Sequence, residues 1–339
     1  MKIAIAHRTG SFSERWINYC TINHIQYEII DPKSNTIIQD IKKFDIFLWH
    51  WHPAISNEFL YARQLIKSIE NLGVLVFPNS DTCWHFDDKV AQKYLLEAIN
   101  APLIPTYVFY EKNEAINWLK KTSYPIVFKL RGGAESINVK LVSTIKEGTK
   151  LAKIAFGKGF SSLNRIEMFN RRIMLYKQRK ANFIDILKSI ARIFIPTKFE
   201  NVAGKQKGYL LFQQFLPNNN SDTRVFIVDN KAFALKRLVR KNDFRASGSN
   251  NPIYDHTAID LSCIKIAFET IQKLKAQCLA FDFIFDEENK PKIVEISYGS
   301  PEKFYDKCEG YWNEDLKWHK GHFIIQELIL KSLISQINK

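Results

Sequence analysis

Hydrophobic and polar positions along the first hundred residues follow a strand period and a helix period in turn. Short β-rich apolar runs occur at residues 2–7, 26–31, 44–51 and 73–79. Between the last two runs, residues 55–73 have apolar positions at helical spacing, and Gly73 is the expected C-cap. Strands and helices that alternate in this way predict an α/β layer built on a parallel sheet.

Beyond residue 86 the β runs become longer and are separated by turns. The expected helices lie at 87–102, 263–276 and 323–336, and the expected strands or strand groups at 106–111, 124–142, 207–251 and 280–300. Residues 163–196 mix apolar and cationic positions at helical spacing until Pro196. A chain of 339 residues that continues an α/β part with an α+β part is expected to form two or three lobes.

The charge of the chain is strongly basic, with a formal net value of +14. The excess is concentrated between Lys146 and Lys207, where 15 Lys and Arg residues occur with 4 Asp and Glu residues. This balance indicates a polyanionic partner, a phosphate-rich substrate or an anionic membrane surface. For residues 165–198 three interpretations stay open: a solvated helical insertion, a surface that docks a polyanionic glycan, and a helix that lies on anionic lipid.

Several classes of protein are disfavoured by the sequence. No stretch approaches the roughly 18 apolar residues of a membrane span, and residues 1–11 predict a strand and a turn rather than a signal peptide. No nucleic-acid-binding motif occurs, so nucleic acid is not an expected partner. A disulfide framework or a zinc knuckle is not expected either, because no C-x-x-C pair occurs among Cys20, Cys83, Cys263, Cys278 and Cys308. These features favour the cytoplasm.

Two carboxylates stand inside the apolar runs of the expected hairpin at 280–300. A turn at residues 286–290 would bring the strand with Asp282 beside the strand with Glu295, and Ser297 shares the face of Glu295. Facing carboxylates repel unless a cation lies between them, and Mg²⁺ is suited to one or two carboxylates plus phosphate oxygens. The alternative is that both acids lie at strand ends in solvent or pair with nearby lysines.

Cationic residues accompany the glycine loop and the neighbouring β runs. Lys129 ends a strand directly before Arg131, Gly132 and Gly133, an arrangement that suits nucleotide phosphates but lacks the P-loop spacing. Farther along, arginines suited to gripping phosphate or carboxylate stand at Arg224, Arg237 and Arg245. An ordinary hairpin turn and solvated strand positions are the respective alternatives.

The stretch WHWHP at residues 49–53 suggests a metal site at first sight, because His50 and His52 alternate on one face of a strand. No third ligand is evident in the sequence. The stretch follows a strand, at the edge where α/β sheets bind ligands. We therefore expect a role in the substrate pocket or in packing rather than in binding zinc.

The order of these motifs resembles that of ATP-grasp ligases. Lys89, Lys129 with its glycine loop, FQQFL, SDTRVFIV, ALKR followed by NDFRASGS, and FDFIFDEENKPKIVEIS occur in the family's order. The resemblance covers residues 75–300 and is greatest to the branch of glutathione synthetases and ribosomal-protein glutamate ligases. The runs FPNSDTCWHFDDK and CEGYWNEDLKWHKG resemble a subgroup that accompanies surface-polysaccharide biosynthesis.

The resemblance implies the ATP-grasp fold, an α/β fold that is α+β in its catalytic part. The implied domains are an N-terminal parallel pre-ATP-grasp domain at 1–85, a small lobe at 86–208 with a basic helical insertion at 146–207, and a large lobe at 209–339 that holds the metal site and the C-terminal helix.

The resemblance also implies ATP and two Mg²⁺ ions, which Mn²⁺ could replace. Asp282 and Glu295 would hold the ions, and Ser297 stands where the family usually has the better ligand Asn. The implied nucleotide contacts are Lys89, Lys129, Gly132, Gly133, Ala134, Glu135, Ser136, Gln213, Gln214, Phe215, Leu216 and Asp222. Arg237 would stabilise the anionic tetrahedral intermediate, with Arg224 and Arg245 in the same catalytic set. Ser136 and Asn138 stand where the ribosomal-protein ligases have glycines.

The implied activity is ATP-dependent carboxylate–amine ligation through an acylphosphate, with release of ADP and phosphate. The expected partners are small carboxylate and amine substrates, free or glycan-linked, such as a uronic acid or amino acid of a surface polysaccharide. Two alternatives stay open: a glutamate or peptide ligase that acts on a protein tail, and a catalytically silent nucleotide-binding scaffold that recruits glycan enzymes. The inner membrane surface is an alternative location, and the oligomeric state is not predicted.

Overall fold

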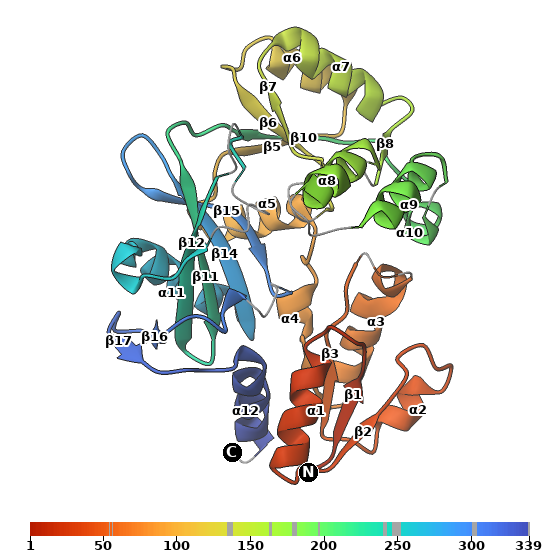
Figure 1. The fold of residues 1–339 in the computed structure, drawn as a ribbon, viewed down its shortest axis with the longest axis vertical. Helices are drawn as coiled ribbons and strands as arrows, with labels where there is room; N and C mark the ends of the chain where they lie inside the picture. Colours follow the sequence, from red (N-terminus) through yellow and green to blue (C-terminus); the bar gives the residue numbers. More distant parts are fainter. Residues whose placement is uncertain are drawn as a thin grey trace.

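Figure 1 shows the computed structural model, in which the chain folds around three main sheets. The structure describes residues 1–53, 55, 57–133, 138–162, 165–177, 182–195, 197–239, 243–245, 252–299 and 304–337. A parallel sheet lies at one end of the molecule and a small antiparallel sheet at the other, with a larger antiparallel sheet between them (Figure 1). In the described part, every helix is too short or too polar to cross a membrane.

The N-terminal unit is a four-stranded parallel sheet in the order β2-β1-β3-β4. Its elements are β1 (Ile3–Ala6), α1 (Ser13–Ile22), β2 (Tyr27–Ile29), α2 (Ile37–Ile41), β3 (Ile46–Trp49), α3 (Glu58–Glu70), β4 (Leu75–Phe77) and α4 (Ser80–Cys83). All residues of β1 and β3 are buried, as expected for strands covered on both faces. The predicted parallel α/β layer is confirmed. Helix α3 ends three residues before Gly73, whose N–H donates to the carbonyl oxygen of Glu70 at 2.9 Å.

The small lobe is a four-stranded antiparallel sheet in the order β5-β10-β6-β7. Its elements are β5 (Thr106–Phe109), α6 (Lys112–Leu119), β6 (Ile126–Lys129), β7 (Lys140–Val142), α7 (Ile145–Ala155) and β10 (Leu210–Gln214). Helices α6 and α7 pack against the sheet, with Trp118 stacked on Phe212 at 5.6 Å between ring centroids. The two β runs expected at 124–142 are therefore the hairpin β6–β7.

The basic segment forms helices that stand between β7 and β10 in the chain. They are α8 (Arg165–Lys177), α9 (Phe183–Phe194) and α10 (Lys198–Ala203), flanked by the short strands β8 (Phe160–Ser161) and β9 (Lys205–Gln206). Helices α8 and α9 pack against each other. The prediction of helix for residues 163–196 is confirmed within the described ranges.

The large lobe is a seven-stranded sheet in the order β15-β14-β11-β12-β16-β17, with β13 also paired to β12. Its elements are β11 (Ser221–Val228), β12 (Lys231–Leu238), β13 (Pro252–Ile253), the 3-10 helix η1 (His256–Ala258), α11 (Leu261–Leu274), β14 (Cys278–Phe285), β15 (Pro291–Ser297), β16 (Gly310–Trp312), β17 (Trp318–Lys320) and α12 (Ile325–Ile337). Asp229 and Asn230 both have positive φ, +47° and +56°, as the tight turn between β11 and β12 requires.

Two hydrophobic cores hold these sheets. One core is continuous through the parallel sheet and the large antiparallel sheet, and the other lies within the small lobe. The buried ring of Tyr298, just after β15, joins the large antiparallel sheet to the N-terminal unit, because it contacts Phe86 at 4.4 Å and Phe77 at 6.0 Å between ring centroids. Helix α5 (Lys89–Ala98) has Asp88 as its N-cap, lies within the helix expected at 87–102, and packs on β15. It thereby lies under the small lobe and beside the large sheet (Figure 1). The lobe boundaries at residues 85 and 208 stay a prediction.

Candidate functional site

The two carboxylates of the β14–β15 hairpin lie directly opposite each other. Asp282 pairs with Glu295 in the antiparallel register, next to a β-bulge between Asp282 and Phe283. Asp282 is buried, and the side chain of Glu295 is 30% exposed. The hairpin prediction is therefore confirmed, and neither acid stands at a solvent-exposed strand end.

Two arginines balance Asp282 from the neighbouring strands. Arg224 faces Asp282 across β11 and β14 and donates to both carboxylate oxygens, from Nε at 2.6 Å and from Nη2 at 2.7 Å. Arg237 on β12 forms a bidentate ion pair with Asp222 and places Nη2 3.0 Å from Asp282 Oδ2. Burial alone would raise the pKa of Asp282, but the two guanidinium groups hold this pKa well below its usual range. Asp282 is therefore ionised at neutral pH.

Arg245 belongs to a different local arrangement. Its guanidinium chelates Asp243, two residues earlier in the same loop, with Nη2 2.8 Å from Asp243 Oδ2. The neighbouring ring of Phe244 makes an edge-to-face contact with Phe215 at 5.9 Å between centroids. Arg245 thus lies close to the end of β10, whereas Arg224 and Arg237 share one cluster with Asp282.

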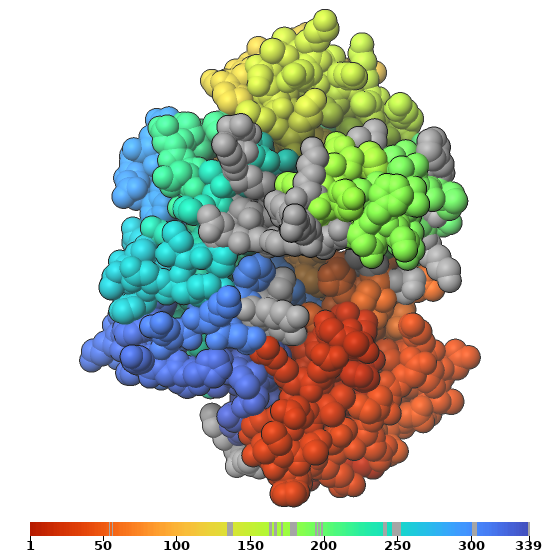
Figure 2. All heavy atoms as spheres, in the orientation of Figure 1, coloured from red at the N-terminus to blue at the C-terminus, as the bar shows by residue number. Residues whose placement is uncertain are grey.

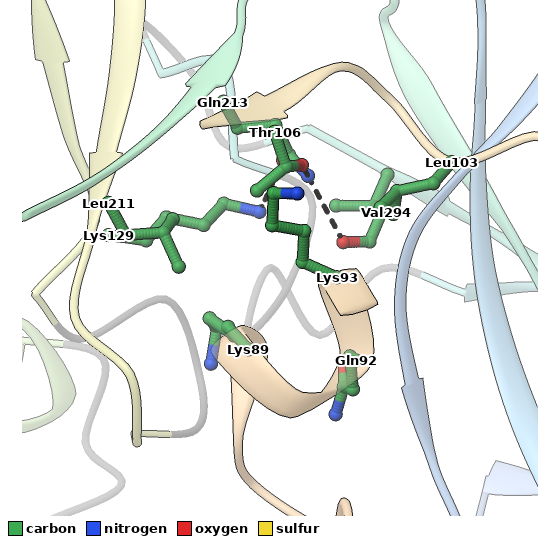
Figure 3. A pocket seen from close by; sticks show the side chains of 9 residues that line it. All are labelled: Lys89, Gln92, Lys93, Leu103, Thr106, Lys129, Leu211, Gln213 and Val294. Carbon is green, nitrogen blue, oxygen red and sulfur yellow. Dashed lines mark hydrogen bonds between the residues drawn. The ribbon is translucent and has the colours of Figure 1, made fainter. Parts of the chain in front are cut away.

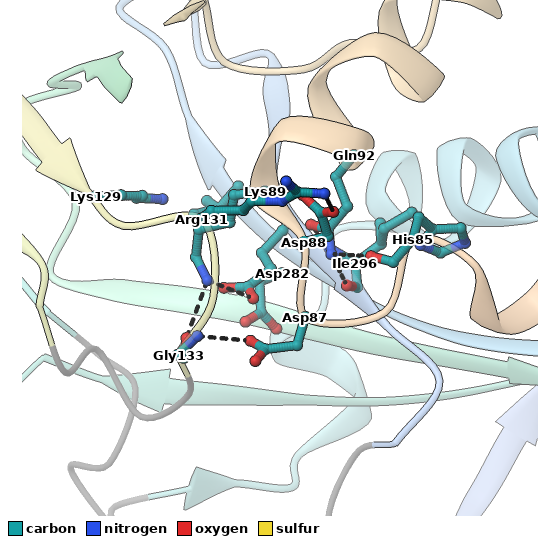
Figure 4. A network of polar contacts seen from close by, with 12 residues as sticks. His85, Asp87, Asp88, Lys89, Gln92, Lys129, Arg131, Gly133, Asp282 and Ile296 are labelled. Atoms are coloured by element: carbon teal, nitrogen blue, oxygen red, sulfur yellow. Dashed lines mark hydrogen bonds and ion pairs between the residues drawn. The ribbon is translucent and has the colours of Figure 1, made fainter. Parts of the chain in front are cut away.

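The turn before α5 holds the base of the glycine loop (Figure 4). Asp87 Oδ1 accepts the N–H of Gly133 at 2.8 Å, and Lys89 Nζ donates to the Gly133 carbonyl at 3.0 Å. Asp88 pairs with Arg131, while the Lys89 N–H donates to the Arg131 carbonyl at 2.9 Å. Three consecutive residues therefore fix residues 131–133. The predicted nucleotide contacts Ala134, Glu135 and Ser136 lie outside the described residues.

Lys89 also reaches strand β15, with Nζ 3.3 Å from Glu295 Oε1. Burial disfavours the charge of this ammonium, but Glu295 and Asp87 outweigh that effect and raise the pKa of Lys89. Burial likewise raises the pKa of Asp87, to about 6, and the charge of Lys89 acts against this. Asp87, Lys89 and Glu295 therefore form one electrostatic unit.

A small hollow, partly open to solvent, lies between the small lobe, α5 and β15. It is lined by Lys89, Gln92, Lys93, Leu103, Thr106, Lys129, Leu211, Gln213 and Val294 (Figure 3). Buried Lys129 donates to Gln213 Oε1 at 2.6 Å, and Gln213 Nε2 donates to Thr106 Oγ1 at 3.1 Å. Burial lowers the pKa of Lys129 to about 8, so its positive charge is held in a poorly solvated place where an anion would be favourable.

The predicted adenine hinge lies where the chain leaves the small sheet for the large one. Gln214 is the last residue of β10, Leu216 is buried, and β11 begins at Ser221. Gln213 and Lys129 of the hollow lie in neighbouring strands just before this connection. Lys89, which contacts both Gly133 and Glu295, lines the hollow together with Gln213, so one side chain links the carboxylate pair, the glycine loop and the strand that leads into this connection.

The WHWHP stretch has a packing role. His50 is half-buried, stacks on Phe12 at 3.8 Å between ring centroids, and accepts the Phe12 N–H at Nδ1. Burial, with a smaller effect of Arg8, lowers the pKa of His50 to about 3 and that of His52 to about 4. Among the residues that the structure describes, no group of three His, Cys, Asp or Glu side chains could hold a metal ion.

Several residues of this site were not predicted from the sequence. Asp87, Asp88, Gln92, Lys93 and Thr106 all line the hollow or hold the glycine loop. Their sequence signal is weak, because a DDK tripeptide before a helix is explained equally well by N-capping. Only the approach of residues 131–133, more than 40 positions later, assigns these side chains to the site.

Comparisons with known proteins agree with this architecture. Residues 191–309 match the family model described as a RimK-like ATP-grasp domain. Alpha-aminoadipate–LysW ligase LysX of Saccharolobus solfataricus is 22% identical over 250 residues, which are 73% of this chain and 74% of that protein. The matched family region contains β11, β12, β14 and β15, the strands that carry Asp222, Arg224, Arg237, Asp282 and Glu295.

Solved structures show the same fold at low sequence identity. D-cycloserine synthetase DcsG has a TM-score of 0.59 at 12% identity and covers 98% of this chain and 100% of its own. D-alanine–D-alanine ligase of Bacillus anthracis has a TM-score of 0.56 at 14% identity, with 100% and 99% covered. The RimK domain ATP-grasp protein of Sphaerobacter thermophilus has a TM-score of 0.52 at 14% identity, with 87% and 90% covered.

Proposed function

We propose that this chain, whose residues 191–309 match the RimK-like ATP-grasp domain model, is an ATP-grasp enzyme and an ADP-forming carboxylate–amine ligase. One observation supports this most directly. Two carboxylates, Asp282 and Glu295, lie opposite each other among cationic side chains, and one of these, Lys89, also lines the hollow between the small lobe, α5 and β15. Phosphoryl transfer depends mainly on such positioning and neutralisation of charge.

ATP would bind between the small lobe and the large sheet. Its adenine would contact the connection at Gln214–Leu216, and its phosphates would face Lys129, Lys89 and the glycine loop. The support is the buried ammonium of Lys129, whose lowered pKa reflects a place that a phosphate anion would stabilise. The carboxylate of Asp222 accepts a hydrogen bond from Arg237. To contact the ribose as well, Asp222 would have to bind Arg237 and the ribose hydroxyl at the same time.

The chemistry of the carboxylates fits Mg²⁺. Asp282, Glu295 and Ser297 offer hard oxygen atoms on adjacent strands, and Mg²⁺ commonly takes only one or two protein carboxylates together with phosphate oxygens and water. Both oxygens of Asp282 already accept from Arg224, so Glu295, which is partly exposed, is the better placed ligand. When bound, Mg²⁺ neutralises phosphate charge, and Mn²⁺ could do the same.

The proposed reaction has two transfers. A substrate carboxylate oxygen bonds to the γ-phosphorus while the bond from that phosphorus to the ADP oxygen breaks, which gives an acylphosphate and ADP. An amine then bonds to the acyl carbon, phosphate leaves, and the nitrogen loses a proton. Arg237 would stabilise the acyl oxygen when it becomes negative, and Asp222 and Asp282 would hold its guanidinium in place.

The acceptor would lie where the N-terminal sheet meets the metal-site strand. Tyr298 directly follows Ser297, and its hydroxyl donates to the Trp51 carbonyl at 3.0 Å. The C-terminal end of β3 is therefore held next to the end of β15. Arg8, whose Nη2 donates to the His50 carbonyl at 3.3 Å, brings a guanidinium to this edge and would suit an acidic acceptor.

We infer that the preferred acceptor is a sugar acid or amino acid of a surface polysaccharide. The reason is that the runs at 77–89 and 308–321 resemble an ATP-grasp subgroup that accompanies surface-polysaccharide biosynthesis. A glutamate or peptide ligase is the second candidate, because the matched relative is named as a ligase that joins alpha-aminoadipate to LysW. A silent nucleotide-binding scaffold would be favoured only by Ser297 in place of Asn.

The test is ADP release from Mg-ATP with pooled carboxylates and pooled amines, added together and then singly. A ligase releases ADP and phosphate only when both pools are present. Glu295→Gln should lower this turnover by about 100-fold or more, because a bound ion contributes several kcal/mol. Glu288→Gln, an exposed residue of the same hairpin paired with Lys290, is the matched control and should keep full activity. AMP and pyrophosphate would contradict the acylphosphate route, and equal nucleotide binding without turnover in all variants would favour the scaffold.

A further inference from the structure

Exposed hydrophobic side chains are concentrated on the insertion helices α8–α10. Of the 20 large hydrophobic side chains that are exposed in the described part of the chain, 8 lie between residues 174 and 202. These are Met174, Tyr176, Phe183, Ile184, Leu187, Ile190, Ile195 and Val202. Single exposed apolar residues are ordinary, but a concentration of this kind indicates a contact surface.

Helix α9 presents two distinct apolar faces. Ile186, Ser189 and Ile193 recur at helical spacing and are half-buried, which makes theirs the inward face. Phe183, Ile184, Leu187 and Ile190 are 59%, 59%, 50% and 40% exposed and form a second stripe, one that turns outward. The outward stripe has no role in the fold of this chain within the residues described.

Cationic residues border the outward stripe. Lys188 and Arg192 are exposed and lie one turn apart on the helix. At about 100° per residue they fall along one edge of the outward stripe, and the inward face adjoins the other edge. The surrounding segment from Lys146 to Lys207 carries 15 basic and 4 acidic residues. An apolar stripe bordered by positive charge is typical of helices that lie in the headgroup region of an anionic bilayer.

The helices are held firmly enough to act as one surface. Arg165 Nε donates to Glu200 Oε1 at 2.8 Å, and Arg165 Nη1 donates to the Ile193 carbonyl at 3.1 Å, so one side chain ties α8, α9 and α10 together. Phe199 contacts Phe59 of α3 edge-to-face at 5.8 Å between centroids. Figure 2 shows these helices as a projecting block at the edge of the molecule.

We propose that the outward face of α9, with its neighbours on α8 and α10, docks this protein reversibly on an anionic lipid bilayer. Helix α9 would lie in the plane of the surface, with Phe183, Ile184 and Leu187 among the upper acyl chains. Lys188 and Arg192 would contact the anionic headgroups. This inference goes beyond the proposed ligase activity and does not depend on it.

Charge complementarity favours a bilayer over the other occupants. A second copy of this chain would bring two strongly basic segments together and would be repelled. A polyanionic glycan or nucleic acid would account for the charge but leave the aliphatic stripe in water. An anionic bilayer satisfies both features at once, because it offers negative headgroups above an apolar layer.

Vesicle co-sedimentation of the full-length protein tests the proposal. The probes are phosphatidylcholine vesicles with and without about 30% phosphatidylglycerol. The protein should sediment with the anionic vesicles and remain largely unbound with the neutral ones. Lys188→Ala with Arg192→Ala should weaken binding about 30-fold, since each charge near the surface contributes about five-fold. Leu187→Asp should weaken binding at least about ten-fold, because it places a charge among the acyl chains.

Matched controls separate this face from general basicity. Leu261→Asp, at an exposed apolar position on α11, and Lys265→Ala with Lys331→Ala, at exposed lysines elsewhere, should leave vesicle binding unchanged. Circular dichroism of each variant verifies folding. Equal binding to neutral vesicles, no binding to either kind, or unchanged binding in the α9 variants would overturn the proposal. Capture by a soluble polyanion without vesicle binding, or a dimer that depends on Leu187, would assign the face to a glycan or to a second copy instead.

Discussion

Lys89 and Glu295 meet at 3.3 Å between Nζ and Oε1, and they join the first turn of α5 to the carboxylate strand β15. The same ammonium donates to the Gly133 carbonyl at 3.0 Å. One side chain therefore contacts both the glycine loop and the carboxylate that we propose for Mg²⁺. The ammonium of Lys89 supplies positive charge beside Glu295, in a place where phosphate charge would also need neutralising.

Lys89→Met should weaken the binding of Mg-ATP by about ten-fold or more, because it removes a buried positive charge from the phosphate region. Isothermal titration calorimetry with Mg-ATP measures the change. Lys265→Met is the matched control, since Lys265 is an exposed lysine on α11, pairs with Glu269 and does not line the hollow. If the two variants lost equal affinity, Lys89 would have no special role beyond the net charge of the protein.

Arg224→Ala should lower the free energy of unfolding by about 3–5 kcal/mol, because it leaves the buried carboxylate of Asp282 without its bidentate partner. Guanidinium denaturation followed by circular dichroism provides the measurement. Replacing the pair together, Arg224→Met with Asp282→Leu, should recover most of the loss, since an apolar pair of similar volume avoids the desolvation of two charges. A single variant as stable as the wild type would show that Asp282 reaches water or another cation when Arg224 is absent.

Asp87→Asn should change how stability depends on pH. The pKa of Asp87 is raised from 3.8 in the unfolded chain to about 6, first by burial and also by nearby Glu295. Between these two values the folded protein keeps a proton that the unfolded chain has released, so rising pH lowers the stability of the wild type. Asn does not titrate, so the free energy of unfolding of the variant lacks this decrease. The difference in free energy of unfolding between the variant and the wild type should therefore rise in the variant's favour by up to ~3 kcal/mol between about pH 4 and pH 7.

Urea unfolding in Mg²⁺-free buffer across this range provides the measurement for Asp87. Asp286→Asn is a control of opposite sign, because the pKa of Asp286 is lowered by the backbone N–H of Lys290 and by Lys292. The stability that Asp286 contributes is present above its unfolded pKa and is lost as the pH falls. A pH profile of Asp87→Asn parallel to that of the wild type would mean that Asp87 is solvated rather than buried.

Local features of the site could be predicted because they depend on spacing within single elements. The strand period places Glu295 and Ser297 on one face, and the turn at 286–290 sets Asp282 opposite Glu295. The cap at Asp88 and the helices of the basic segment follow from the same kind of local pattern. The bounds of the helices α1, α6 and α7 were not predicted from the sequence.

The sequence by itself determined the parallel layer, the hairpin with its two carboxylates and the order of the motifs, because strand and helix periods and tight turns act over a few residues. Only the tertiary structure decided what surrounds those carboxylates. Arg224 reaches Asp282 because β11 lies next to β14, and Asp87 reaches Gly133 because α5 packs on β15 below the small lobe. Which strand or helix packs next to which depends on the burial of whole sheet and helix faces. A pattern that spans a few residues does not contain that information.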